Sequence, residues 1–240
     1  MKVKTLTAVL SSLLLSSAAM AGPMYLYDIN NPGGSTGAGD VKNVTTSYDT
    51  SSGLFNWSHT IGQTGSGALS DAFWLVVSPG ANPKGNNTEL AIIYGDLDSN
   101  RMSVYQYNGK NSANSYKTES LLASVNNAFN VSDNAGNRTV SFSFDASGIN
   151  GAGCDYPAVN NPGNDMDKGI CFGQKVGIWF HPSAGSSFSY DNMGGIASYS
   201  YSSQSWYDTA NRVTTEVSEP GIVGLLSAGL FGLMFARRKA

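Results

Sequence analysis

The stretch LFNWSHTI, at residues 54–61, alternates large and small polar side chains from its second position onward. A period of two residues is typical of a β-strand with one buried face. The side chains on that face are Phe55, Trp57, His59 and Ile61. A second apolar run, FWLVV at residues 73–77, does not alternate and is followed by Ser-Pro-Gly. That pattern predicts a strand buried on both faces.

Further strand patterns follow, separated by turn-forming residues. One hairpin is expected from residues 89–94 and 102–107, and a second from residues 129–133 and 139–144. Residues 176–181 and 196–201 add two more strands. Many short strands with turns between them favour an antiparallel fold over alternating strands and helices.

Two other segments give different patterns. Residues 22–50 are rich in Gly, Asn, Ser and Thr, and the sequence Asn-Pro-Gly-Gly at residues 31–34 predicts a turn or loop. At most one helix is expected, at residues 118–129. Its apolar residues at helical spacing are Leu121, Leu122, Val125 and Phe129. With no fixed repeat and no internal linker, we expect a single all-β domain, an antiparallel β-sandwich or jelly-roll-like fold, over residues 22–216.

The first 21 residues are typical of a secretory signal peptide. Lys2 and Lys4 precede a short apolar stretch, and Ala19 and Ala21 place small side chains where signal peptidase cleaves. The sequence therefore predicts export across the inner membrane.

The C-terminal segment predicts a membrane helix. Residues 221–236 carry no charge and are followed by Arg237, Arg238 and Lys239. As a helix the 16 residues would span about 24 Å, somewhat less than the ~30 Å hydrocarbon core. The three cations are expected to stay on the cytoplasmic side, which places the rest of the chain on the other side.

Immediately before this run lie Ser218, Glu219 and Pro220. A short Glu-Pro motif, one apolar helix and a terminal basic cluster together resemble the PEP-CTERM sorting signal, here at residues 217–240. Ser218 stands where that family usually has Pro. The resemblance implies processing by exosortase, a membrane-embedded cysteine transpeptidase of Gram-negative bacteria that make exopolysaccharide. A plain membrane anchor is the alternative interpretation.

The charge of the central segment argues against a nucleic-acid partner. The chain has 14 Lys and Arg and 17 Asp and Glu, and five of those cations and one carboxylate lie in the terminal segments. Nine cations and 16 carboxylates remain, so the central segment carries a net charge near −7. Because the cations are scattered, no basic stripe is available to displace counterions from a phosphate backbone.

Three groups of residues are candidate sites. Cys154 and Cys171, the two cysteines of an exported chain, predict a disulfide. Acidic turns supply oxygen atoms suited to calcium, although Asp and Asn also build ordinary tight turns. The candidate calcium ligands are Asp96, Asp98, Asn100, Asp165 and Asp167. The candidates for stacking on sugar rings are Tyr199, Tyr201 and Trp206, with a place in the core or on an ordinary sheet surface as the alternative.

No catalytic motif stands out in the chain. Its serines lack the strand–turn–helix context of a nucleophile elbow, and His59 and His181 lie alone on strand patterns. We expect an exported, non-catalytic protein of the cell surface or extracellular matrix, associated with exopolysaccharide and carrying no cofactor other than calcium. The alternatives are a secreted glycosidase-like hydrolase and a purely structural surface spacer.

Overall fold

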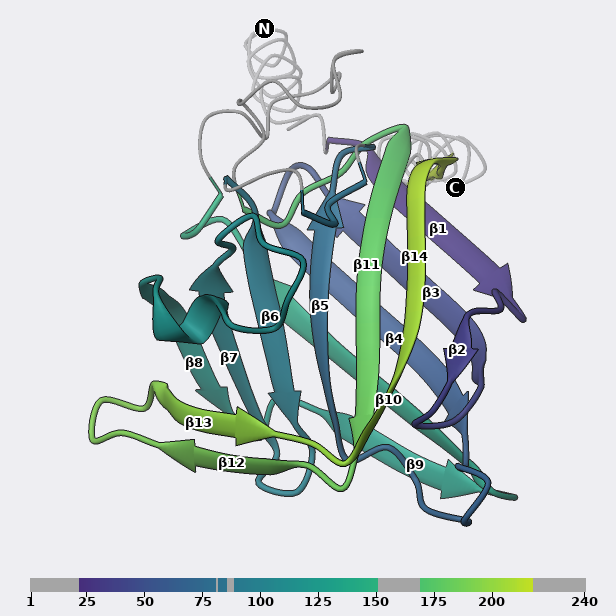
Figure 1. Ribbon diagram of the computed structural model, residues 1–240. Helices are drawn as coiled ribbons and strands as arrows, with labels where there is room; N and C mark the ends of the chain where they lie inside the picture. Colours follow the sequence, from purple (N-terminus) through teal and green to yellow (C-terminus); the bar gives the residue numbers. More distant parts are fainter. Residues whose placement is uncertain (1–21, 81, 86–88, 151–168, 218–240) are drawn as a thin grey trace, which may run out of the picture.

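The computed structural model describes residues 22–80, 82–85, 89–150 and 169–217. These residues form an all-β, β-sandwich-like fold with two antiparallel sheets and a separate hairpin (Figure 1). The predicted fold class is therefore confirmed for the described part of the chain.

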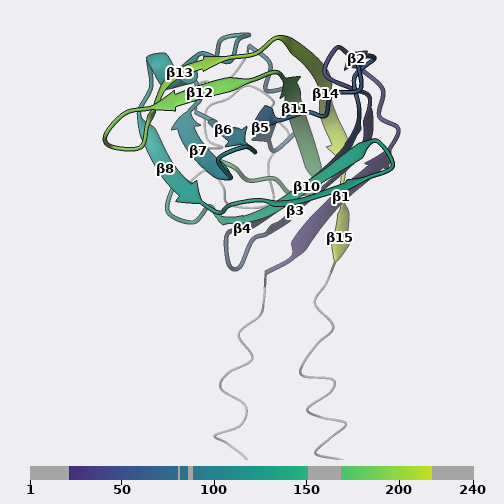
Figure 2. The ribbon, with the colours of Figure 1, turned by 90° about the horizontal axis from the view of Figure 1, so that it is seen from below.

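The first sheet has six strands among the described residues, in the order β15-β1-β3-β4-β10-β9. Their bounds are β15 Thr215–Val217, β1 Met24–Asn30, β3 Val41–Asp49, β4 Leu54–Gly62, β10 Asn137–Asp145 and β9 Asn130–Asn134. The strands β1 and β15 lie side by side at one edge, with Met24 opposite Val217 (Figure 2). The chain therefore enters and leaves the described body at neighbouring positions.

The second sheet has seven strands among the described residues, in the order β2-β14-β11-β5-β6-β7-β8. Their bounds are β2 Ser35–Thr36, β14 Ser203–Val213, β11 Lys175–Ala184, β5 Ala72–Ser78, β6 Ala91–Asp96, β7 Arg101–Gln106 and β8 Leu121–Asn126. A two-stranded hairpin of β12 (Ser187–Tyr190) and β13 (Ile196–Ser200) crosses this sheet (Figure 1).

The main core lies between the two sheets. On β4, the four side chains expected to face inward are all fully buried, and β5 is buried along its whole length, as the sequence predicts. Phe73 of β5 stacks on Phe142 of the opposite sheet, with ring centroids 6.1 Å apart and planes at 16°. Its ring also crosses Gly95, its partner on β6. These contacts connect the sheets through aromatic packing.

His59 belongs to this core. Its imidazole is 0% exposed, and its Nδ1 accepts a hydrogen bond from Trp57 Nε1 at 2.9 Å. The rings of Phe180 and Phe73 pack against it at 4.6 and 5.3 Å. Burial lowers the pKa of His59 to about 3, so the ring is neutral at pH 7.

A second apolar cluster lies on the outer face of the seven-stranded sheet. It is built around Trp74, Trp179 and Tyr94, and the hairpin packs on it through Phe188 and Tyr199. The hairpin is also held by hydrogen bonds, because Tyr105 Oη accepts the N–H of Ile196 and Tyr190 donates to Asp96 at 3.0 Å. Arg101 lies 4.1 Å over the Tyr190 ring. This sheet is therefore covered on both faces over part of its area.

The predicted helix at residues 118–129 is wrong. Residues 121–126 form strand β8, whose side chains alternate between half-buried and exposed. Leu121, Val125 and Phe129 fit both a helical and a two-residue period, and antiparallel pairing with β7 selects the strand and leaves Leu122 exposed. The segment at residues 22–50 is more ordered than its composition indicates, because most of it forms β1 and β3.

Two sequence predictions at the ends of the chain lie outside the described residues. The signal peptide at residues 1–21 and the apolar segment at 221–236 are not described. Within the described ranges, no helix has the length and apolar character needed to cross a bilayer. Cys171 is buried and is not a free thiol, but its predicted partner Cys154 also lies outside the described residues. That pairing stays a prediction.

Candidate functional site

The outer face of the six-stranded sheet is covered by small polar side chains. Each strand that places aromatic residues in the core presents its alternate residues on this face. Thr45 lies opposite Ser58, Ser58 opposite Ser141, and Ser141 opposite Asn130, so one row crosses four strands. Three strand spacings of about 4.8 Å give this row a length of about 14 Å. That length suits a short oligosaccharide better than a single sugar.

An open groove of about 220 Å³ follows this row. Its other lining residues with outward side chains are Ser47, Asn56 and Ser143, which form a second row in the same register. All of these groove residues are uncharged. The groove therefore offers hydroxyl and amide groups along its length. At its end, Asp28 on β1 lies opposite Thr45 and accepts a hydrogen bond from the Thr45 hydroxyl at 3.0 Å.

The two rows differ in how their polar groups are used. In the second row, Ser143 donates to Asn56 at 2.6 Å, and Asn56 donates to Ser47 at 3.1 Å. In the first row, the side chains of Ser58 and Ser141 have no hydrogen-bond partner among the described residues. Their hydroxyl groups are available to a ligand, whereas the three side chains of the second row hold one another in place.

The predicted stacking residue Tyr199 is half-buried. Its ring stacks on Phe188 at 4.4 Å and meets Tyr94 edge-on at 6.1 Å, and its hydroxyl is 2.8 Å from Ser183 Oγ. Burial raises the pKa of its hydroxyl. Tyr199 therefore holds the hairpin against the sheet, whereas Tyr201 beside it is 43% exposed.

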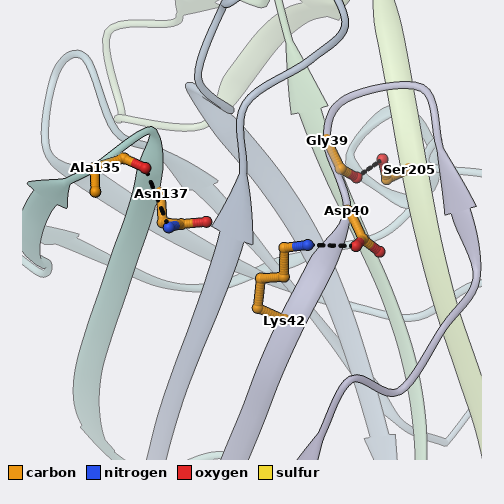
Figure 3. Close-up of polar contacts among 6 residues, drawn as sticks. All are labelled: Gly39, Asp40, Lys42, Ala135, Asn137 and Ser205. Carbon is orange, nitrogen blue, oxygen red and sulfur yellow. Dashed lines mark hydrogen bonds and ion pairs between the residues drawn. The ribbon is translucent and has the colours of Figure 1, made fainter.

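Trp206 on β14 is also 43% exposed. Contacts of the neighbouring backbone hold this part of the strand in place. The preceding residue, Ser205, is fully buried, accepts the N–H of Ala38 at 2.8 Å and donates to the carbonyl of Gly39 (Figure 3). Next to Gly39 in the close-up, Asp40 forms an ion pair of 2.6 Å with Lys42 near the start of β3.

The glycine-rich loop approaches Trp206 from the edge of the sheet. The backbone of Trp206 pairs with Ser35 of β2, and a Cβ on Gly34 would collide with the carbonyl of Trp206. Only glycine allows this approach, particularly because Gly34 has a φ of +119°. The loop therefore fixes the backbone beneath the exposed indole.

In the acidic loop at residues 96–100, two of the three candidate calcium ligands are already engaged in hydrogen bonds. Asp96 accepts the backbone N–H of Ser99 at 3.1 Å as well as the Tyr190 hydroxyl. The Asn100 amide binds the backbone of Phe129 through both its oxygen and its nitrogen, at 2.8 and 3.1 Å. Asp98 is exposed, and partial burial, followed by the charges of Asp71 and Asp96, raises its pKa.

No group of three or more His, Cys, Asp or Glu side chains lies close enough to hold a metal ion within the described ranges. The calcium hypothesis for the Asp96 loop stays a prediction. Asp165 and Asp167, the other candidate calcium ligands, lie outside those ranges. So do Ala19 and Ala21 of the signal peptide and the sorting-signal residues Ser218, Glu219, Pro220, Arg237, Arg238 and Lys239.

The two histidines are packed among aromatic rings. His181 stacks on Trp74 at 3.9 Å with planes at 8°. Burial lowers the pKa of His181 to about 4, while Gln204 acts in the opposite direction. Like His59, it is therefore neutral at pH 7 and belongs to a packed aromatic cluster.

No family model, curated protein or solved structure matches this chain. Its candidate sites are therefore judged by their own geometry.

The groove residues were missed by reasoning from sequence alone. Their signal is the polar half of the strand alternation, visible at Asn56 and Ser58 and again at Ser141 and Ser143. Alternation shows that such residues share a face of their own strand. It does not give the register that aligns four strands into one row, because register depends on pairing between distant segments.

Proposed function

We propose that this protein is an exported, non-catalytic component of the cell surface or extracellular matrix that binds exopolysaccharide. The uncharged groove on the six-stranded sheet is the observation that carries this proposal. Sugar hydroxyls both donate and accept hydrogen bonds, and Ser, Thr and Asn side chains match them in both roles. An open groove also suits one stretch of a long polymer better than an enclosed pocket would.

The same groove gives no support to the hydrolase alternative. Glycoside hydrolysis ordinarily requires two carboxyl groups on either side of the scissile bond. The side chains that line the groove include hydroxyls and amides but no carboxylate. A purely structural spacer remains the competing function, and it would bind no polysaccharide.

Filling the groove tests the proposal. Ser58→Trp places a large ring in the middle of the first row, so binding to exopolysaccharide purified from the source bacterium should weaken about tenfold or more. Co-sedimentation of the purified full chain with the polymer measures this, with calcium and with chelator. Loss of binding on chelation would support the Asp96 or Asp165 loop as a calcium site.

Ser132→Trp is the matched control, because Ser132 lies exposed on β9 and does not line the groove. It should bind as the unaltered protein does. Equal binding by Ser58→Trp and Ser132→Trp, with both folded by circular dichroism, would exclude the groove as the site. No binding by the unaltered protein would favour a spacer.

We further propose that exosortase removes the C-terminal segment at the membrane, after signal peptidase has removed the N-terminal one. The support is the sequence resemblance at residues 217–240. Mass spectrometry of surface protein should find no peptide beyond about Glu219 in native cells. A strain without exosortase should retain Arg237, Arg238 and Lys239, and their presence on mature native protein would reduce the segment to a plain anchor.

A further inference from the structure

A second exposed feature lies on the other sheet, around Trp206. Asp208 pairs with Trp179, which belongs to the outer cluster of the seven-stranded sheet. Residues two apart on a strand share a face, so Trp206 also lies on the outer face of that sheet. The groove and the Trp206 indole therefore occupy the outer faces of two different sheets.

Polar groups surround the exposed indole. Lys84 Nζ lies 5.9 Å from the centre of the Trp206 ring and 3.3 Å from an oxygen of Asp208. The side chains of this ion pair are 40% and 25% exposed. Gln204, two residues from Trp206 on the same face, is half-buried and donates to Ser183 at 3.3 Å. Together they place donors and acceptors beside an apolar ring without a net charge.

This combination matches the chemistry of a pyranose. One face of such a sugar presents C–H groups that pack on an indole, and its rim presents hydroxyls that hydrogen-bond to charged and amide side chains. Because the Lys84–Asp208 pair is neutral overall, a neutral sugar fits better than an acidic one. The buried Ser205 and the close approach of Gly34 hold the backbone at Trp206 in place before binding, which lowers the ordering cost.

We propose that Trp206, Lys84 and Asp208 form a second carbohydrate-binding site, so that one molecule bridges two polysaccharide chains. This inference rests on the proposed function, because the groove supplies the first site. Two sites on different sheets cross-link polymers, whereas a single site only coats them.

The test separates binding from bridging. Mixed with soluble exopolysaccharide from the source bacterium, the full chain should increase light scattering up to an intermediate protein ratio and reduce it again in excess. Ser58→Trp and Trp206→Ala should each keep part of the binding and lose the scattering, and the double variant should lose both. Within the Ser58→Trp background, Trp206→Ala should weaken the remaining binding about tenfold or more, and Trp206→Phe should weaken it less.

Met193→Ala is the matched control, because Met193 is 87% exposed at the tip of the hairpin. It should leave binding and scattering unchanged. If Ser58→Trp alone abolishes all binding, or if Trp206→Ala scatters as the unaltered protein does, the second site is excluded while the proposed function stands. If the unaltered protein does not bind, the proposed function itself fails. Sedimentation velocity must show a monomer, because scattering produced by a self-associating protein would also overturn bridging by two sites in one chain.

Discussion

Acidification from pH 6.5 to pH 4 should strongly destabilise this protein, because its two histidines are buried in the neutral form. The pKa of His59 is about 3 in the folded state, against about 6.5 in an unfolded chain. Between these values the unfolded state binds a proton that the folded state does not. The free energy of unfolding is therefore highest above pH 6.5 and falls by about 1.4 kcal/mol per pH unit for this one residue.

His181 adds to the same loss. Its pKa of about 4 also lies below the unfolded value, so its contribution has the same sign between pH 6.5 and pH 4. Because His181 is only partly buried, its share is smaller than that of His59. Together the two slopes approach about 2.7 kcal/mol per pH unit as an upper limit. Asp49 and Asp133, whose pKa values are lowered, extend the loss to more acidic solutions.

Urea unfolding at several pH values measures this slope. His181→Gln should reduce the slope to about the 1.4 kcal/mol per pH unit expected from His59 alone. His59→Asn should remove the larger part, provided that the variant folds. A free energy of unfolding that stays constant between pH 6.5 and pH 4.5 would contradict the burial of both rings.

Replacing Gly95 by alanine should destabilise the core by about 1–3 kcal/mol or more through overpacking. The added Cβ would overlap three ring atoms of Phe73, which lies across Gly95 on the inner face of β6. That ring cannot move away easily, because Phe142, Phe129 and His59 pack around it.

A double-mutant cycle gives the control. Phe73→Ala alone should cost about 3–5 kcal/mol, because it leaves a cavity between the sheets. In that background, Gly95→Ala should cost little or even stabilise, since alanine loses less backbone entropy than glycine when a strand forms. Equilibrium unfolding in urea measures the free energy of unfolding of the unaltered protein, the two single variants and the double variant. Additive effects would show that the Phe73 ring does not restrict residue 95.

The interior of this fold could be predicted further than its surface. The alternation at residues 54–61 predicts the inward side chains of β4, and the continuous apolar run at residues 73–77 predicts that β5 is buried. Both predictions succeed because burial requires apolar residues at local, regular positions in the sequence. The strands β1 and β3 leave a weaker trace. The inward residues of β3 are spaced among Asn, Thr and Ser, which on composition favour turns, and β1 is a short Tyr-rich run at the start of the same polar segment.

The candidate sites depend on contacts that local patterns do not contain. Ser58, Ser141 and Asn130 meet because two separate strand pairings share one register. Trp206 was identified from sequence, but Lys84 is 122 residues away along the chain and reaches it only through the fold. The half-buried position of Tyr199 follows from the hairpin crossing the sheet, which a single strand pattern does not show.

The pairing of β1 with β15 also determines how this body would bear a mechanical load. Among the described residues, three residue pairs connect β15 to β1, with Met24 opposite Val217 at the outer end. A force pulling Val217 away from the sheet would open these pairs one after another, starting at Met24, and each step would meet the resistance of a single pair. The nine-residue strands β3 and β4 behind them would stay intact. If the protein were tethered through its C-terminal end, β15 would thus detach and lengthen under force while the rest of the six-stranded sheet stayed folded.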